Sequence, residues 1–177
     1  IPDSYQPSLL EDSSGVFWLG SLGGVLSIFD RDKGKCVKHY RHNPDDPDSI
    51  TKCSQIRYLL EDRDNPAVLW LGTRGGGLDK FDKKTEKFTH YMADPDDPNR
   101  LGSHSGIDTL YDDGRGFLWI STLGGGLSRL DKKRDTFKHQ RHDPEDPNTI
   151  ASNEGGESKE AENVHLWKCA MATGLDR

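Results

Sequence analysis

Short apolar runs alternate with polar turns along residues 55–91, and this pattern predicts β-strands. Apolar side chains recur at every second position of the first run, and the later runs are rich in β-branched and aromatic residues. Acidic, glycine-rich and lysine-rich stretches separate the runs, as in turns between antiparallel strands. The pattern therefore predicts four short strands: one with Ile56, Tyr58 and Leu60 on one face, then Val68–Thr73, Leu78–Phe81 and Lys87–Tyr91.

This pattern occurs three times along the chain. Its most regular segment is found at 17–30, 69–82 and 118–131. The tryptophans of these segments, Trp18, Trp70 and Trp119, lie 52 and 49 residues apart. A repeat of about 50 residues is typical of a stacked or radial array of one supersecondary unit. The sequence therefore predicts an all-β fold of β-propeller blades, each made of four antiparallel strands.

The repeat divides the 177 residues into about three blades and a degenerate partial fourth. The expected units are 1–54 for blade 1 and its loop to blade 2, 55–105 for blade 2, 106–150 for blade 3 and 151–177 for the partial blade. The glutamate-rich stretch 151–163 has no alternating apolar positions and is expected to be poorly ordered. A propeller closes with roughly 4 to 8 blades, so an incomplete propeller from a larger protein is predicted.

Residues that recur in every repeat are expected to have structural roles. The tryptophans occupy one strand position in each copy, which favours packing between blades over stacking on a sugar. Glycines of the second turn can adopt positive φ, and aspartates that open the third turn can cap backbone N–H groups. The residues with these expected roles are Trp18, Trp70, Trp119, Gly24, Gly76, Gly125, Asp30, Asp82 and Asp131.

The motifs follow one another in this order: an acidic turn, the LWLGT segment, a double or triple glycine, LDKFD, and FxHY before DPDDPN. Together, over residues 8–150, they resemble the two-component regulator propeller repeat. In that family, such repeats form the extracytoplasmic sensor region of bacterial receptors, many of them hybrid histidine kinases. The resemblance implies a periplasmic or extracytoplasmic location as part of a membrane-anchored receptor. It also implies a phosphorelay output outside this chain, with the remaining blades and a receptor dimer partner as protein partners.

Charge and composition limit the classes of binding partner that are expected. The net charge of −6, with scattered Lys and Arg, argues against nucleic acid. No run approaches the roughly 18 uninterrupted apolar residues of a membrane helix, so no membrane contact by this segment is expected. Residues 1–7 lack the features of a signal peptide, and any export signal is expected outside this segment. Cys36, Cys53 and Cys169 do not recur at the repeat period, so they leave the redox compartment undecided.

The candidate ligand-binding face combines the loops between blades with the glycine turns. In a propeller whose first strand is innermost, these connections emerge on one face, and loops on a rigid scaffold are the usual place for binding. The alternative is that the repeated loops are solvated connectors only. The side chains expected nearest the axis are Arg74, Leu22, Leu123, Lys52, Ser54, His104 and Ser105.

Metal binding and catalysis find little support. Asp45, Asp46 and Asp48 supply oxygen ligands of the kind calcium prefers, but neighbouring prolines hold the loop extended, which favours a solvated acidic loop. His39 and His42 are three apart on or at the end of a strand, so their side chains point to opposite faces. The recurring carboxylates occupy turns, and no nucleophile elbow or P-loop appears. No catalytic residue, metal or cofactor is expected.

The chain is therefore expected to be a fragment of a ligand-sensing propeller, with a carbohydrate or its breakdown product as the ligand class suggested by the family. One alternative is a protein-interaction scaffold or a secreted carbohydrate-binding propeller without a signalling role. Another is a propeller lyase, which would need a catalytic His or Tyr unique to one blade and close to the axis. Because open blade edges are exposed, the isolated segment is expected to be poorly soluble or oligomeric.

Overall fold

The computed structural model describes residues 8–94, 96–97, 99–102, 106–150 and 153. Within these residues the chain forms twelve strands in three sheets and no helix. Blade 1 consists of β1 (Ser8–Glu11), β2 (Phe17–Gly20), β3 (Leu26–Asp30) and β4 (Lys35–Tyr40). Blade 2 consists of β5 (Gln55–Glu61), β6 (Val68–Arg74), β7 (Leu78–Asp82) and β8 (Lys87–Tyr91). Blade 3 consists of β9 (Ile107–Asp112), β10 (Phe117–Thr122), β11 (Gly126–Asp131) and β12 (Thr136–Gln140).

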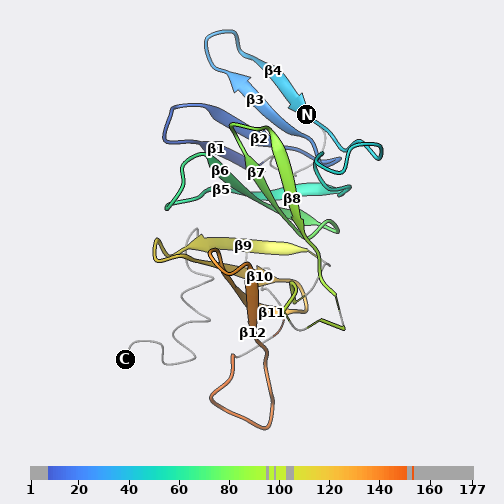
Figure 1. Ribbon diagram of the computed structural model, residues 1–177, viewed down its shortest axis with the longest axis vertical. Coiled ribbons are helices and arrows are strands. Elements are labelled where there is room, and N and C mark those ends of the chain that lie inside the picture. The colour runs from blue at the N-terminus through green and yellow to red at the C-terminus, as the bar shows by residue number, and fades with distance from the viewer. Residues whose placement is uncertain (1–7, 95, 98, 103–105, 151–152, 154–177) are drawn as a thin grey trace.

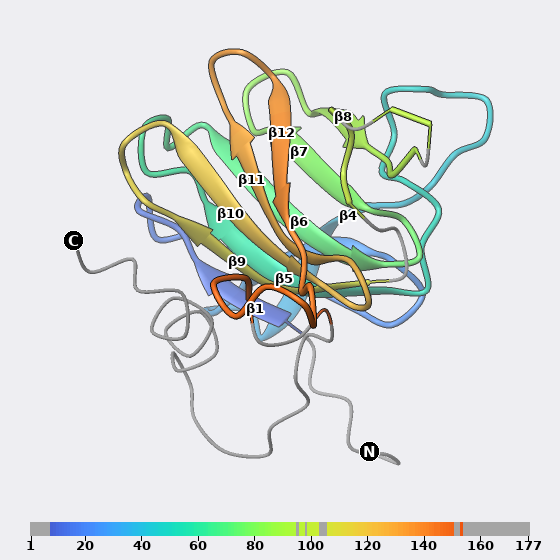
Figure 2. The same ribbon diagram turned by 90° about the horizontal axis from the view of Figure 1, so that it is seen from below.

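Each blade is an antiparallel meander in which consecutive strands are hydrogen-bonded neighbours. Figure 1 shows the three sheets stacked along the long axis of the molecule. In Figure 2 the first strands β1, β5 and β9 gather at one side, while β4, β8 and β12 spread at the other. β5 contacts both β1 and β9, so the first strand of each blade is innermost. The prediction of an all-β, incomplete propeller is confirmed, because the described sheets do not close into a ring.

The predicted degenerate blade, 151–177, with the stretch expected to be poorly ordered, lies outside the described residues apart from position 153. Within the part of the chain that the structure describes, no helix is long and apolar enough to cross a membrane.

The innermost strand of blade 2 departs from simple alternation. The register shifts between Ile56 and Tyr58, and Arg57 is left out of the pairing with β6. Because of this bulge, Ile56 and Leu59 are buried against blade 1, whereas Tyr58 and Leu60 pack against the core shared with blade 3. One extra residue in a strand reverses the face on which the neighbouring side chains lie. The prediction that Ile56 shares a face with Tyr58 and Leu60 was therefore wrong.

The apolar core lies between the blades. At the interface of blades 1 and 2, Phe81 packs edge-on against Trp18, with 5.6 Å between ring centroids, and against Tyr40, at 4.9 Å. At the interface of blades 2 and 3, Tyr91 packs edge-on against Phe137 at 5.8 Å. Such aromatic pairs contribute about 0.5–1.5 kcal/mol each beyond the burial of their surface. Each blade is therefore held mainly by its neighbours.

The loops between blades are anchored by their last apolar residue. Ile50, Leu101 and Ile150 end the three loops and are almost fully buried. In the first loop, the backbone of Asp46 donates to Asn43 O and accepts from the backbone N–H of Ser49, which gives two successive turns. The loops are thus fixed to the core at the end of the blades where the glycine turns also lie.

Candidate functional site

Ser54 joins the glycine turns of two blades on the predicted binding face. Its carbonyl oxygen accepts a hydrogen bond from the backbone N–H of Gly23 at 2.8 Å, in the turn of blade 1. Its backbone N–H and hydroxyl both donate to the carbonyl oxygen of Arg74 at 3.1 Å, in the turn of blade 2. Leu22 forms an isolated bridge with Gln55, the next residue. The structure therefore brings Leu22, Ser54 and Arg74 together.

Leu123 continues this row into blade 3. Its backbone N–H donates to Gly106 O at 2.9 Å. A Cβ built on Gly106 would lie 3.0 Å from Leu123 Cδ1 and 3.8 Å from Arg74 Cγ, so this glycine lies between the two side chains. Lys52 is exposed in the connection from blade 1 to blade 2. Two predicted residues of the face lie outside the described residues: His104 and Ser105.

The row Leu22–Arg74–Leu123 presents one cation between two aliphatic side chains. Leu22 is 57% exposed, and Arg74 and Lys52 are also exposed. A guanidinium forms bidentate hydrogen bonds with carboxylates and similar oxyanions, and the exposed Leu22 and half-buried Leu123 offer apolar contact. The row can therefore contact a ligand that has both an oxygen-rich edge and an apolar side.

A buried polar cluster, which the sequence analysis missed, lies in blade 2 beside this face. The fully buried carboxylate of Asp79 accepts hydrogen bonds from the backbone and hydroxyl of Thr51, at 3.0 and 2.6 Å, and from His90 Nδ1, at 2.8 Å. His90 Nε2 donates to Pro47 O at 3.1 Å. The bond to Asp79 raises the pKa of His90. Because both ring nitrogens are engaged, His90 has no free nitrogen to act as a base.

Asp79 distinguishes blade 2 from the other two blades. At the equivalent position, Ser27 of blade 1 and Ser128 of blade 3 have hydroxyls that contact the Nδ1 atoms of His39 and His139, at 2.8 and 2.9 Å. The sequence signal was one aspartate in LDK where the other copies read LSI and LSR. A serine hydroxyl beside the histidine is thereby replaced by a carboxylate in blade 2.

A charged contact also joins blade 1 to blade 2 on the opposite face. Trp18 Nε1 and Lys83 Nζ both donate to Asp12 at 2.8 Å, and Lys83 also contacts Glu61 at 2.7 Å. We call this arrangement, a basic side chain of one blade between carboxylates of two blades, the inter-blade clasp. Burial tends to raise the pKa of Asp12, but hydrogen bonds from Lys83, Ser14 and Trp18 hold that pKa well below its usual range.

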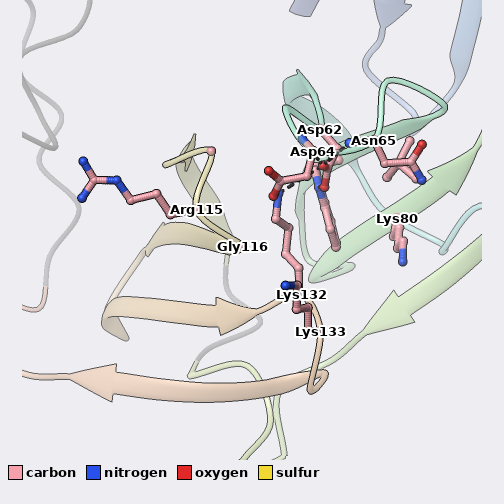
Figure 3. A pocket seen from close by; sticks show the side chains of 11 residues that line it. Asp62, Asp64, Asn65, Lys80, Arg115, Gly116, Lys132 and Lys133 are labelled. Carbon is pink, nitrogen blue, oxygen red and sulfur yellow. Dashed lines mark hydrogen bonds and ion pairs between the residues drawn. The ribbon is translucent and has the colours of Figure 1, made fainter.

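The same clasp joins blade 2 to blade 3. Lys132 Nζ lies 3.1 Å from Asp62, 2.7 Å from Asp64 and 2.7 Å from Asp112, and Trp70 Nε1 donates to Asp62 at 2.8 Å. Figure 3 shows Lys132 reaching toward Asp62 and Asp64 at the edge of a cavity of about 490 Å³. The three carboxylates lie close enough together to ligate a cation, but the ammonium group of Lys132 already lies among them. The arrangement serves as a salt bridge between blades.

The weaker metal candidates have other partners. Asp46 Oδ1 accepts a hydrogen bond from the backbone of Asp48 at 3.0 Å, and the Asp48 carboxylate pairs with Lys87 at 2.7 Å. The backbone N–H of Asp45 donates to Asn43 Oδ1 at 3.1 Å. The contacts of Asp45 and Asp46 lie within their own turn, whereas Asp48 pairs with a strand of blade 2, so the carboxylates of Asp46 and Asp48 have separate partners.

The repeated turn aspartates bind the backbone of their own turns, and the third repeated tryptophan lies at the open side of blade 3. One carboxylate oxygen accepts two backbone N–H groups of its own turn at each of Asp30, Asp82 and Asp131. Trp119 is half-buried on the open side of blade 3, where the guanidinium of Arg129 lies 5.5 Å from its ring centroid. His39 contacts Ser27, as above, while His42 Nδ1 contacts Ile50 O at 3.0 Å.

Two of the repeated glycines are needed for close packing around Cys53. A Cβ on Gly24, which has φ of 69°, would lie 2.6 Å from Cys53 Sγ, and one on Gly76 would lie 2.8 Å from Cys53 Cβ. Gly125 lies between two glycines with φ of 73° and 72°. Burial and the charge of Asp79 raise the pKa of the Cys53 thiol to about 11. Cys53 therefore serves as an apolar contact between the two turns.

The blades, the inter-blade clasps and the exposed row on one face define an open segment of a β-propeller. No family model and no curated protein sequence matches the chain. Among solved structures, the chain is similar to the extracellular domain assigned to the hybrid two component system BT3049 from B. thetaiotaomicron, with a TM-score of 0.71 and 22% identity. That match covers 92% of this chain and 22% of the other.

Two further structures share the fold. The extracellular domain assigned to the hybrid two component system BT4673 from B. thetaiotaomicron has a TM-score of 0.57 and 28% identity, over 76% of this chain and 17% of that one. The β-propeller domain of Cps50 (Swd1) from Myceliophteria thermophila has a TM-score of 0.54 and 10% identity, over 98% of this chain and 46% of that one. The resemblance to the propellers of two-component sensors is thereby confirmed, and this chain spans about a fifth of their extracellular domains.

Proposed function

We propose that the chain is part of the ligand-sensing propeller of an extracytoplasmic, membrane-anchored receptor, and that it passes binding to a kinase output domain elsewhere in that receptor. The observation that carries this proposal is the 28% identity, over three quarters of the chain, to an extracellular domain assigned to a hybrid two component system. The fold match to the BT3049 extracellular domain covers 92% of the chain.

The ligand class that we propose is a carbohydrate or its breakdown product. Arg74 is the one basic residue of the row Leu22–Arg74–Leu123, and Lys52 lies in the adjoining connection. Guanidinium and ammonium groups bind carboxylates and other oxyanions, so an acidic sugar fits this row better than a neutral one. The exposed Leu22 and the half-buried Leu123 contact the apolar side of the ring.

Calorimetry with neutral and acidic oligosaccharides tests this assignment. We expect an acidic oligosaccharide to bind, and Arg74→Ala to weaken its binding at least about tenfold, because a charge-assisted pair contributes roughly 1.5–3 kcal/mol. Arg115→Ala is the matched control, since Arg115 is an exposed arginine on the opposite face and points away from the carboxylates in Figure 3. Equal loss in both variants, or binding that ignores Arg74, would contradict the assignment.

The signalling part of the proposal is tested by the gene itself. A membrane-spanning segment and a histidine kinase domain in the same reading frame support a receptor. A secreted protein without either would refute the receptor function while leaving ligand binding to be judged by calorimetry.

A further inference from the structure

One histidine of blade 2 joins the loop between blades 1 and 2 to the outermost strand of blade 2. The loop 43–50 contacts β8 at two backbone positions. The backbone N–H of Phe88 donates to Asp48 O at 2.9 Å, and His90 Nε2 lies 3.1 Å from Pro47 O. In its sheet β8 pairs only with β7, so the loop covers part of the outer edge of blade 2.

Both ring nitrogens of His90 face hydrogen-bond acceptors. Nε2 faces the carbonyl oxygen of Pro47, and Nδ1 faces a carboxylate oxygen of Asp79 at 2.8 Å. A neutral imidazole has only one N–H group, so only the imidazolium can donate to both oxygens. The Thr51 hydroxyl lies 2.6 Å from Asp79 and from His90 Nδ1, but its single hydrogen can serve only one of them. The geometry therefore fits the protonated ring.

The two nitrogens differ in how firmly they hold a proton. The N–H at Nδ1 bonds to the fully buried carboxylate of Asp79, whereas the N–H at Nε2 bonds to the uncharged carbonyl of Pro47. Hydrogen bonds to an ionised acceptor are roughly twice as strong as bonds between neutral groups. When the ring loses a proton, Nδ1 therefore keeps its own. The lone pair of Nε2 then faces the carbonyl oxygen, and that contact is lost.

The charged groups around His90 favour the imidazolium. The hydrogen bond to Asp79 raises the pKa of His90, and the charges of Asp79 and Asp48 add to this effect, although burial opposes it. The Asp48 carboxylate also pairs with Lys87 of β8 at 2.7 Å, where both side chains are exposed. The Cys53 thiol near Asp79 has its pKa raised to about 11 and is uncharged at neutral pH. The loop contact is thus present in acid and is lost as the pH rises through the folded-state pKa of the histidine.

The equivalent histidine of blade 3 needs no particular charge. Nδ1 of His139 contacts the hydroxyl of Ser128 at 2.9 Å. A hydroxyl can donate to an unprotonated ring nitrogen or accept from a protonated one, so this pair is satisfied in either state. The backbone N–H of Phe137 donates to Asn99 O of the preceding loop at 3.3 Å, as Phe88 does to its own loop in blade 2. Blade 3 is therefore an internal control for blade 2.

We propose that His90 is a pH-operated latch on the loop between blades 1 and 2. As the imidazolium it fastens the loop to β8 through the carbonyl oxygen of Pro47. As the neutral ring it keeps its bond to Asp79 and releases the loop as far as Ile50, whose side chain is fully buried. For the proposed receptor, a pH-dependent loop then borders the ligand-binding face, and this consequence alone rests on the proposed function.

Nuclear magnetic resonance of the whole isotope-labelled chain, between about pH 5 and pH 9, tests the latch. We expect both ring nitrogens of His90 to carry a proton in acid and Nε2 to lose its proton first. The hydrogen-exchange protection of the Phe88 amide, corrected for the intrinsic effect of pH on exchange, should fall roughly tenfold, because one charge-assisted hydrogen bond is lost. The protection of the Phe137 amide should stay constant.

Two variants test the source of the pH dependence. Asp79→Ser gives blade 2 the serine and histidine pair of the other blades, and the protection of its Phe88 amide should no longer change with pH. His90→Gln cannot titrate and should have the same effect, so the test does not depend on the folding of Asp79→Ser. His139→Gln is the matched control and should keep the pH dependence of the parent at Phe88.

Three results overturn the proposal. The first is a neutral His90 ring with its proton on Nε2, and the second is an equal change in protection at Phe88 and Phe137. Both of these need only the parent chain. The third is a pH dependence at Phe88 that persists in folded Asp79→Ser or His90→Gln. Because none of these measurements uses a ligand, the latch and the proposed function can fail separately.

Discussion

Removing the lysine of the second clasp is expected to weaken the joint between blades 2 and 3. Lys132→Met keeps much of the length of the side chain but removes the ammonium group, which contacts three carboxylates within 3.1 Å and is 9% exposed. Removing one partner of a buried ion pair costs about 3–5 kcal/mol, because the carboxylates of Asp62 and Asp112 stay buried without compensation. For a chain of this size, that loss corresponds to a decrease in melting temperature of roughly 6–20 °C.

If the loss of stability comes from the missing ion pair, it should depend on pH. Burial tends to raise the pKa of Asp112, but Lys132 and two backbone N–H groups outweigh it and lower the pKa. A carboxylate with a lowered folded-state pKa contributes stability above its unfolded pKa of about 3.9 and loses it as the pH falls through the folded value. Without Lys132 the carboxylate of Asp112 protonates more readily. The difference between parent and variant should therefore shrink below about pH 4.

Thermal denaturation followed by circular dichroism, from acidic to neutral pH, measures both effects. Lys133→Met is the matched control, because Lys133 is the next residue, lines the same cavity and is exposed without an ion pair among the described residues. Its melting temperature should stay close to that of the parent. Equal melting temperatures for the two variants, or a difference that persists unchanged in acid, would refute the reasoning.

Two further predictions concern the turns of the binding face. The pKa of His90 is raised in the folded state. Its contribution to folding stability is therefore fully present below its unfolded pKa of about 6.5 and is lost as the pH rises through the folded value. Asp79→Ser should remove on the order of 1 kcal/mol of this pH-dependent stability, measured by thermal melts between pH 6 and 8. Gly24→Ala should lower the free energy of unfolding by about 2–5 kcal/mol in chemical denaturation, because the new Cβ collides with Cys53 and the φ of this residue is positive. Gly23→Ala is the control: its φ is also positive but the space around it is open, so it should cost about 1–2 kcal/mol.

The strands could be predicted from sequence because each one is defined by local alternation and by the turn residues beside it. The bulge at Arg57 could not, since nothing in the residues around it differs from an ordinary strand. The clasp was also missed. Lys83 and Asp12 are 71 residues apart, and their contact depends on how one blade packs on the next. Repetition in sequence shows which positions are equivalent, but it does not show which side chains meet across an interface.

Two residues that differ between blades lie beside the connection from blade 1 to blade 2. Asp79 replaces serine at a repeated strand position, and Arg74 replaces leucine at a repeated turn position. The segment 51–54 touches both, since Thr51 donates to Asp79 at one end and Ser54 donates to the carbonyl of Arg74 at the other. The Nε2 atom of His90 also donates to the carbonyl oxygen of Pro47 in the preceding loop. Any ligand that binds Arg74 therefore contacts a connection whose other end is fixed by a charged, titratable cluster, and the other two described blades have no such cluster.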